Sequence, residues 1–188
     1  MNTLYNEKDG WFSKLVNFAG DGSDSGGKNE KFIYDNTLDM SSIYAIYKFG
    51  LLDIDDERLE HAVKAAEDRL WCKTDVGGIA RYVGDNYYRT SDAVPGNPWF
   101  ITTLWLAQFY LLRAKSEKDL AKPKEIFKWV AKYALPSGIL SEQINPYTGE
   151  QVSAAPLTWS HAEFVSSIIL YLEKLEELGI CLTCYPVG

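Results

Sequence analysis

The chain carries apolar residues at the period of an α-helix in five separate segments. The predicted helices span residues 39–49, 55–71, 97–114, 120–134 and 158–178. The second and fourth are charged along one side, which is typical of a helix with a single buried face. The other three are apolar around most of their circumference and should lie inside the molecule. Buried and amphipathic helices therefore alternate along the chain.

The two amphipathic segments predict which residues face the core. The inward stripe of segment 55–71 consists of Leu59, Ala62, Val63, Ala66 and Leu70. That of segment 120–134 consists of Ile126, Phe127, Val130 and Ala131, with lysines on the outer side. Because both stripes recur every three or four residues, each should pack as one face of a helix.

Side chains that commonly cap helices lie at the start of three of the predicted segments. The candidate caps are Ser41 or Ser42, Asn97 before Pro98, and Thr158 or Ser160, with Glu163 completing a capping box after Ser160. Gly50 is a stop signal for the first helix.

The connections between the predicted helices alternate between short and long. The segments 72–96 and 135–158 are long loops, whereas the other two connections take only a few residues. Long structureless loops in compact domains are usually functional. Strict alternation in antiparallel helix pairs places both long loops at one end. The pattern predicts an all-α ring of helix pairs with its working surface at one mouth.

Composition limits the class of protein and its partners. The chain has 188 residues, 46% of them hydrophobic, and a net charge of −7, so we expect one domain and no nucleic acid as partner. It shows no long apolar run and no signal-peptide pattern at its start, which predicts no membrane span and a cytoplasmic location. Residues 1–38 should be irregular, with a mobile Gly/Ser/Asp-rich loop at 20–30.

Three cysteines, Cys72, Cys181 and Cys184, are present. An odd count without a secretory signal favours free thiols and a reducing compartment. The Cys181–Cys184 spacing suits a zinc site, but no second pair supplies the other two ligands. We therefore expect no metal and no cofactor.

The two long loops combine aromatic side chains with charged ones. The first holds Arg81 and Tyr82, and the second holds Glu142 between Ile139-Leu140 and Ile144. Sugars need directed hydrogen bonds to their hydroxyls and a flat apolar contact for their C–H faces. Such loops fit carbohydrate binding, although tyrosine and tryptophan in helical proteins more often belong to the core.

Two long motifs on these loops resemble a known family. They are GGIARYVGDNYYRTSDAVPGNPWFITTLWLAQFY from Gly77 and GILSEQINPYTGEQVSAAPLTWSHAEFV from Gly138. Both are similar to glucoamylases, glycoside hydrolase family 15, in order and spacing, over roughly residues 30–180. The resemblance implies an (α/α)6 toroid, of which this chain carries about the C-terminal half. It also implies α-glucan or maltooligosaccharide substrates and hydrolysis with inversion.

The resemblance assigns roles to individual residues. Glu142 falls on the general base, Arg81 on an arginine that hydrogen-bonds sugar hydroxyls, and Trp159 on an aromatic lining the innermost subsite. Tyr82 and Trp99 complete the substrate-binding set.

Other readings of these residues stay open. Glu142 could cap a turn, and Trp159 could serve packing alone. Arg81 could form an ordinary ion pair with Asp85 or Asp92. We expect a structural hydrogen bond from His161.

The family's general acid belongs to an earlier loop of the toroid. The sequence shows no Trp-Glu-Glu segment of the kind that carries it, so we expect the chain to be nearly inactive alone. An open half-ring would also expose apolar surface, which predicts a separate N-terminal half or self-association. The alternative is a non-catalytic carbohydrate-binding or regulatory helical module of the same fold.

Overall fold

The computed structural model describes residues 4–19 and 31–181. Its five α-helices are α1 (Met40–Lys48), α2 (Glu57–Leu70), α3 (Phe100–Arg113), α4 (Ala121–Tyr133) and α5 (Thr158–Glu177), with a 3-10 turn, η1 (Glu117–Leu120), before α4. The predicted segments match these helices to within three residues at each end. The predicted loop at 20–30 and Cys184 lie outside the described residues.

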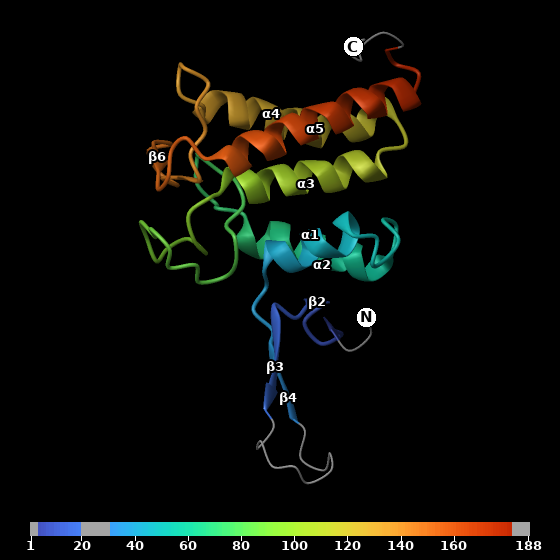
Figure 1. The fold of residues 1–188 in the computed structure, drawn as a ribbon, viewed down its shortest axis with the longest axis vertical. Helices are drawn as coiled ribbons and strands as arrows, with labels where there is room; N and C mark the ends of the chain where they lie inside the picture. Colours follow the sequence, from blue (N-terminus) through green and yellow to red (C-terminus); the bar gives the residue numbers. More distant parts are fainter. Residues whose placement is uncertain (1–3, 20–30, 182–188) are drawn as a thin grey trace.

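Within residues 1–38, the described parts 4–19 and 31–38 are more regular than we expected. Strand β1 (Tyr5–Asn6) pairs antiparallel with β2 (Trp11–Phe12), and β3 (Leu15–Ala19) pairs with β4 (Lys31–Asp35). A third short pair, β5 (Gln143–Ile144) with β6 (Gln151–Val152), lies in the second long loop. The β3–β4 hairpin extends away from the helices (Figure 1).

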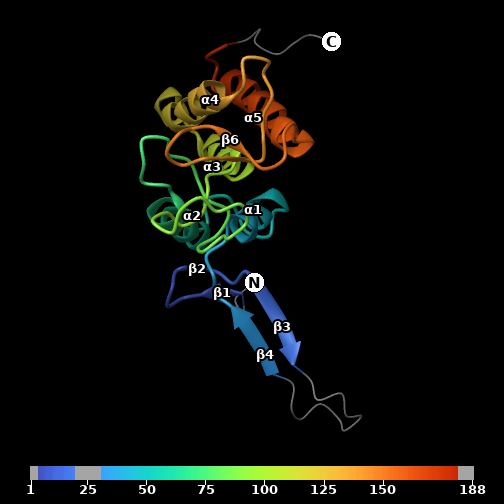
Figure 2. The ribbon, with the colours of Figure 1, turned by 90° about the vertical axis from the view of Figure 1, so that its left-hand side faces the viewer.

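Helix α3 lies between the pair α1 and α2 and the pair α4 and α5, as Figure 2 shows from the loop end. In α3, 11 of 14 residues are buried, so it is surrounded, as its uniform apolar character predicts. Helix α2 buries Leu59, Ala62, Val63, Ala66 and Leu70, which confirms its predicted stripe. In α4, Ile126 and Val130 are buried, but Ala131 is exposed, so its inward placement was wrong.

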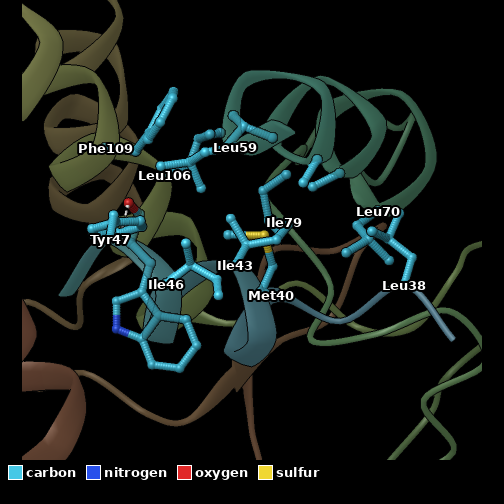
Figure 3. Packing of buried hydrophobic residues seen from close by; sticks show 14 of the residues in the cluster. Leu38, Met40, Ile43, Ile46, Tyr47, Leu59, Leu70, Ile79, Leu106 and Phe109 are labelled. Carbon is cyan, nitrogen blue, oxygen red and sulfur yellow. Dashed lines mark hydrogen bonds between the residues drawn. The ribbon is translucent and has the colours of Figure 1, made fainter. Parts of the chain in front are cut away.

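The main core joins helices α1, α2 and α3. Figure 3 shows Ile43 and Ile46 from α1 packed against Leu59 from α2 and Leu106 and Phe109 from α3. A second cluster lies beneath the loop between α4 and α5, where Leu140 and Ile144 pack on side chains of α3 and α4. These two clusters hold the loops that follow α2 and α4 against the helical body.

The predicted caps are wrong where tertiary partners compete for the same side chains. Helix α1 is capped by Asp39, whose carboxylate accepts from the Ser41 N–H at 2.7 Å. Helices α3 and α5 have no side-chain cap, because Trp99 and Leu157 occupy their N-cap positions. The predicted caps Asn97 and Ser160 bond to other segments instead. A buried polar group that finds a distant partner is no longer available to its own helix end.

The cysteine prediction is corrected in part. Cys72 is free and fully buried, and burial raises the pKa of its thiol to about 12. Cys181 is disulfide-bonded, so free thiols were a wrong expectation there, and the cysteines no longer argue for a reducing compartment. The described residues contain no group of acids, histidines and cysteines that could hold a metal. No helix among them is long and apolar enough to cross a membrane.

Candidate active site

Both long loops lie at the same end of the helices, as their length pattern predicts (Figure 1). The first loop, 71–99, connects α2 to α3, and the second, 134–157, connects α4 to α5. An isolated bridge between Trp99 and Gln143 joins them, while a second bridge, between Ala80 and Pro98, closes the first loop on itself. The two loops therefore form one connected surface.

Glu142 is held by its backbone between the two loops. Its N–H donates to the carbonyl of Ala154 at 2.9 Å, and its carbonyl accepts from Phe100 N–H at 3.3 Å. Its apolar neighbours Leu140 and Ile144 are 2% and 0% exposed and anchor the segment in the core. The carboxylate itself is half-buried. Apolar flanks thus fix the backbone so that the acid is presented at the loop surface.

A second loop residue holds the carboxylate of Glu142. Ser153 donates its hydroxyl to Oε2 of Glu142, whereas no described residue bonds to Oε1. Ser153 has φ of 67°, a left-handed conformation that non-glycine residues rarely adopt and that often marks a functional site. One carboxylate oxygen is therefore oriented by the protein, and the other remains available to accept a hydrogen bond.

Arg81 forms a two-point ion pair with Asp85. Its Nη2 lies 2.8 Å from Oδ1 and its Nε lies 3.0 Å from Oδ2, and Asp85 is 1% exposed. Burial acts to lower the pKa of Arg81, but the hydrogen bonds and charge of Asp85 raise it above its ordinary value. The expected alternative of an ion pair with Asp85 is thus present. It leaves Nη1 of Arg81 without a partner among the described residues.

Aromatic rings surround the Arg81 guanidinium. Its carbon lies 4.4 Å from the ring centre of Trp99 and 4.8 Å from that of Tyr82. Trp99 is only 4% exposed, so it supports the guanidinium from beneath rather than offering an open face. Tyr87, 5.8 Å away, closes a third side. Cation–π contacts of this kind limit where the guanidinium can point.

Trp159 lies in the first turn of α5 with 51% of its surface exposed. Hydrogen bonds tie this turn to the Glu142 segment: Ser160 Oγ donates to the Ser141 carbonyl at 2.7 Å. The Leu140 N–H donates to His161 Nε2 at 3.1 Å, which is the structural role expected for His161. Trp159 thus combines a fixed backbone with an open aromatic face.

The five predicted residues form one continuous arrangement. Arg81 and Tyr82 contact each other and Arg81 contacts Trp99. Trp99 precedes the residue that bonds to the Glu142 backbone, and Trp159 adjoins the residue bonded to Ser141. The surface presents a carboxylate that can accept a proton, a guanidinium that can donate hydrogen bonds, and an indole face. These are the groups that a sugar site requires.

Sequence reasoning missed the roles of two residues that shape this site: Ser153 orients Glu142, and the buried Glu163 bonds to Trp159. It offered Asp85 as an ion-pair partner of Arg81, and that pair is present. Ser153 carried no local signal, since it lies eleven positions from its partner. Glu163 was assigned to a capping box, and its position four residues after Trp159 on the same helix was the signal that could have indicated its partner.

Comparison with known proteins shows that the chain is similar to glycosyl hydrolases. Residues 117–169, which include Glu142 and Trp159, match the model of glycosyl hydrolases family 15. Over these residues the chain is similar to part of a family 15 glycosyl hydrolase. It is 42% identical over 140 residues to an uncharacterized glycosyl hydrolase of Methanocaldococcus jannaschii, covering 70% of this chain and 21% of that protein. It is 26% identical over 144 residues to a trehalase of Mycolicibacterium smegmatis, covering 76% and 20% respectively.

Solved structures of this family share the fold. A bacterial glucoamylase complexed with acarbose superposes with a TM-score of 0.62 at 23% identity, covering 86% of this chain and 23% of that one. A family 15 glucoamylase from Hypocrea jecorina gives 0.58 at 16% identity, covering 100% and 39%. The likeness confirms the predicted (α/α)6 toroid, of which this chain is a part. The chain spans about a fifth of the length of the family 15 relatives it matches in sequence.

Proposed function

We propose that the chain is part of an inverting glycoside hydrolase acting on α-linked glucosides, with Glu142 as its general base. The carrying observation is the Glu142 carboxylate, fixed through Oε2 by Ser153 and open at Oε1, on the loop surface shared with Arg81 and Trp159. A general base must accept a proton from water in one defined direction. A carboxylate with one oxygen held and one free meets that need.

In an inverting reaction this carboxylate removes a proton from a water molecule as the water attacks the anomeric carbon. A second carboxylic acid protonates the leaving oxygen from the opposite face, about 6.5–9.5 Å from the base. We propose that this acid comes from a segment outside these 188 residues. The base alone then leaves the departing alkoxide poorly stabilised, and the isolated chain is nearly inactive.

The remaining site residues would bind the sugar. Nη1 of Arg81 would donate to hydroxyl groups, with its position set by Asp85 and by the rings of Tyr82 and Trp99. The exposed face of Trp159 would pack on the C–H face of the ring. Relatives include trehalases and a glucoamylase that binds acarbose, which supports α-linked glucosides as the substrate class. Among these we propose α-glucans and maltooligosaccharides first.

The experiment compares Glu142→Gln with Glu150→Gln, an exposed acid on the same loop. Both are introduced into the chain fused to the preceding helical segment of the Methanocaldococcus jannaschii relative, and release of glucose from maltotriose and trehalose is measured. Loss of the base should lower kcat by about 10²–10⁴-fold, while Glu150→Gln should not. Proton NMR of the first product should show the β-anomer.

Four results would contradict the proposal. Unchanged turnover in Glu142→Gln would remove the base assignment, and an α-anomeric product would remove inversion. If the fused wild-type protein binds maltotriose without hydrolysing it, the non-catalytic binding module is the better description. Turnover by the unfused chain at the fused rate would show that the 188 residues contain their own acid.

A further inference from the structure

A buried carboxylate, Glu163, lies behind the exposed indole of Trp159. Glu163 is on α5, one turn after Trp159, and is 9% exposed. Its Oε1 accepts from Trp159 Nε1 at 3.1 Å, and its Oε2 accepts from Gln108 Nε2 of α3 at 2.7 Å. On the α1 side, burial together with the charge and hydrogen bonding of Glu163 raises the pKa of Tyr44 to about 12. Groups from three helices therefore converge on this acid.

The partners of Glu163 in the described part of the chain are neutral. No described lysine or arginine pairs with it, and Gln108 also donates to Ser167 Oγ at 3.0 Å. Burying a carboxylate without a cation is costly unless its hydrogen bonds are made. A residue that served packing alone would be better replaced by a neutral side chain. The negative charge of Glu163 is best explained by its effect on the two groups that donate hydrogen bonds to it, Trp159 Nε1–H and Gln108 Nε2–H.

The donor most affected is Trp159. Half of its surface is open to solvent, so packing alone leaves its side chain several orientations. The Nε1–H bond to Glu163 and an edge contact with the Trp105 ring, 5.8 Å between centres, select one of them. Trp105 is in turn stacked on Tyr44 at 4.2 Å and 12°. Tyr44, Trp105 and Trp159 thus form a continuous row of ring contacts, and Glu163 is hydrogen-bonded to the Trp159 end of this row.

We propose that Glu163 is a positioning residue, which holds the Trp159 indole in the orientation that presents its face to the sugar. The inference rests on the proposed saccharide site and assigns no chemical step to Glu163. A ring already fixed in its bound orientation loses less conformational freedom when a ligand packs on it. Hydrogen bonds to a charged acceptor are stronger than those to a neutral one. The charge therefore strengthens the bond that fixes the ring.

The test uses the 188-residue chain with Glu163→Gln, Glu163→Leu and, as a matched control, Glu173→Gln, an exposed acid on the same helix. Two readouts are measured: the indole N–H resonance of Trp159 by ¹⁵N NMR, assigned with Trp159→Phe, and maltotriose affinity. Glu163→Leu should shift that resonance, speed its hydrogen exchange and weaken binding about tenfold. Glu163→Gln should give a smaller change in the same direction, and Glu173→Gln none.

A double-mutant cycle separates positioning from general destabilisation. In the Trp159→Phe background there is no indole N–H to hold, so Glu163→Leu should cause no further loss of affinity. An equal loss with and without the indole would overturn the proposal, as would an unchanged Trp159 resonance. Should Glu163→Leu fail to fold, Glu163→Gln carries the same comparison. If the wild-type chain binds no maltotriose, its proposed saccharide site fails, and the Trp159 resonance still decides whether Glu163 holds the ring.

Discussion

Among the site residues, Asp85 is the one whose removal should disturb the most contacts. It is 1% exposed, makes both bonds to Arg81 and accepts from the Tyr87 N–H at 3.1 Å. Asp85→Asn keeps the shape but removes the charge that the half-buried guanidinium needs. We expect a loss of about 2 kcal/mol in the free energy of unfolding, from the range for hydrogen bonds between charged groups. Urea denaturation followed by circular dichroism measures it.

Asp92→Asn is the matched control for Asp85→Asn. Asp92 pairs with Arg89 at 3.5 Å, but its side chain is 99% exposed, so its removal should leave the urea midpoint unchanged. Equal midpoints for the two variants would show that the Arg81–Asp85 pair contributes no more than a surface ion pair.

At this scale the sequence predicted residues that belong to motifs and missed those that act through distant contacts. Glu142, Arg81 and Trp159 lie within long family motifs, and they belong to the two long loops and the first turn of α5, which meet at one end of the helices. Ser153 reaches Glu142 only through the folding of the second long loop, and no local pattern in a single sequence reports that pairing. Glu163 lies one helical turn after Trp159 on α5, so their contact follows from helix geometry.

At the scale of elements, the contact between α5 and the Glu142 loop should be sensitive to one hydroxyl. Ser160 and Ser141 are both fully buried, and Ser160 Oγ donates to the Ser141 carbonyl. Ser160→Ala leaves that buried carbonyl without this donor, which should cost about 1–2 kcal/mol. Hydrogen exchange should become faster in the segment 139–142. Turnover of the fused protein should fall as Glu142 becomes less well fixed.

The control for Ser160→Ala lies on the same helix. Ser166 is exposed, so Ser166→Ala should be neutral or slightly stabilising, because alanine favours the helix more than serine does. Unchanged exchange in 139–142 after Ser160→Ala would mean that other bonds suffice to hold the loop.

Helices were predictable because their apolar period is a property of the local sequence, whereas their ends were not. Asn97 and Ser160 look like caps, yet each donates to the chain across a loop: Asn97 to Gln143 and Ser160 to Ser141. The β3–β4 hairpin escaped prediction because residues 20–30 separate its strands, so no tight-turn motif marks their pairing in the sequence.

For the whole molecule, the most informative feature of the sequence was the alternation of short and long connections between helices, because it predicted where the two long loops lie. It placed both long loops at one end before any contact was known, because antiparallel pairs allow no other arrangement. The chain spans about a fifth of the length of the curated relatives that it matches. The five described helices form part of the toroid and leave one side of α3 and α5 uncovered by other described helices.

The uncovered side of α5 and α3 is an apolar face. Val165, Ile169 and Leu112 are 55%, 40% and 38% exposed. Leu112 and Ile169 also line a groove between α1, α3 and α5 with a volume of about 430 Å³. Exposed apolar patches of this kind usually mark interaction surfaces. In a closed toroid this face would be covered by the neighbouring helices of the ring.

We therefore expect the isolated chain to self-associate through this face, and the fused protein to remain monomeric. Replacing Val165 and Ile169 together by Gln should shift the isolated chain toward monomer in sedimentation velocity, because it removes apolar area from the contact. Leu51→Gln changes a residue of similar exposure, 50%, that does not line this groove, and it should leave the association unchanged. A wild-type chain that stays monomeric at every concentration would show that the open face is stable in water. A Leu51→Gln effect as large as that of the double variant would place the contact elsewhere.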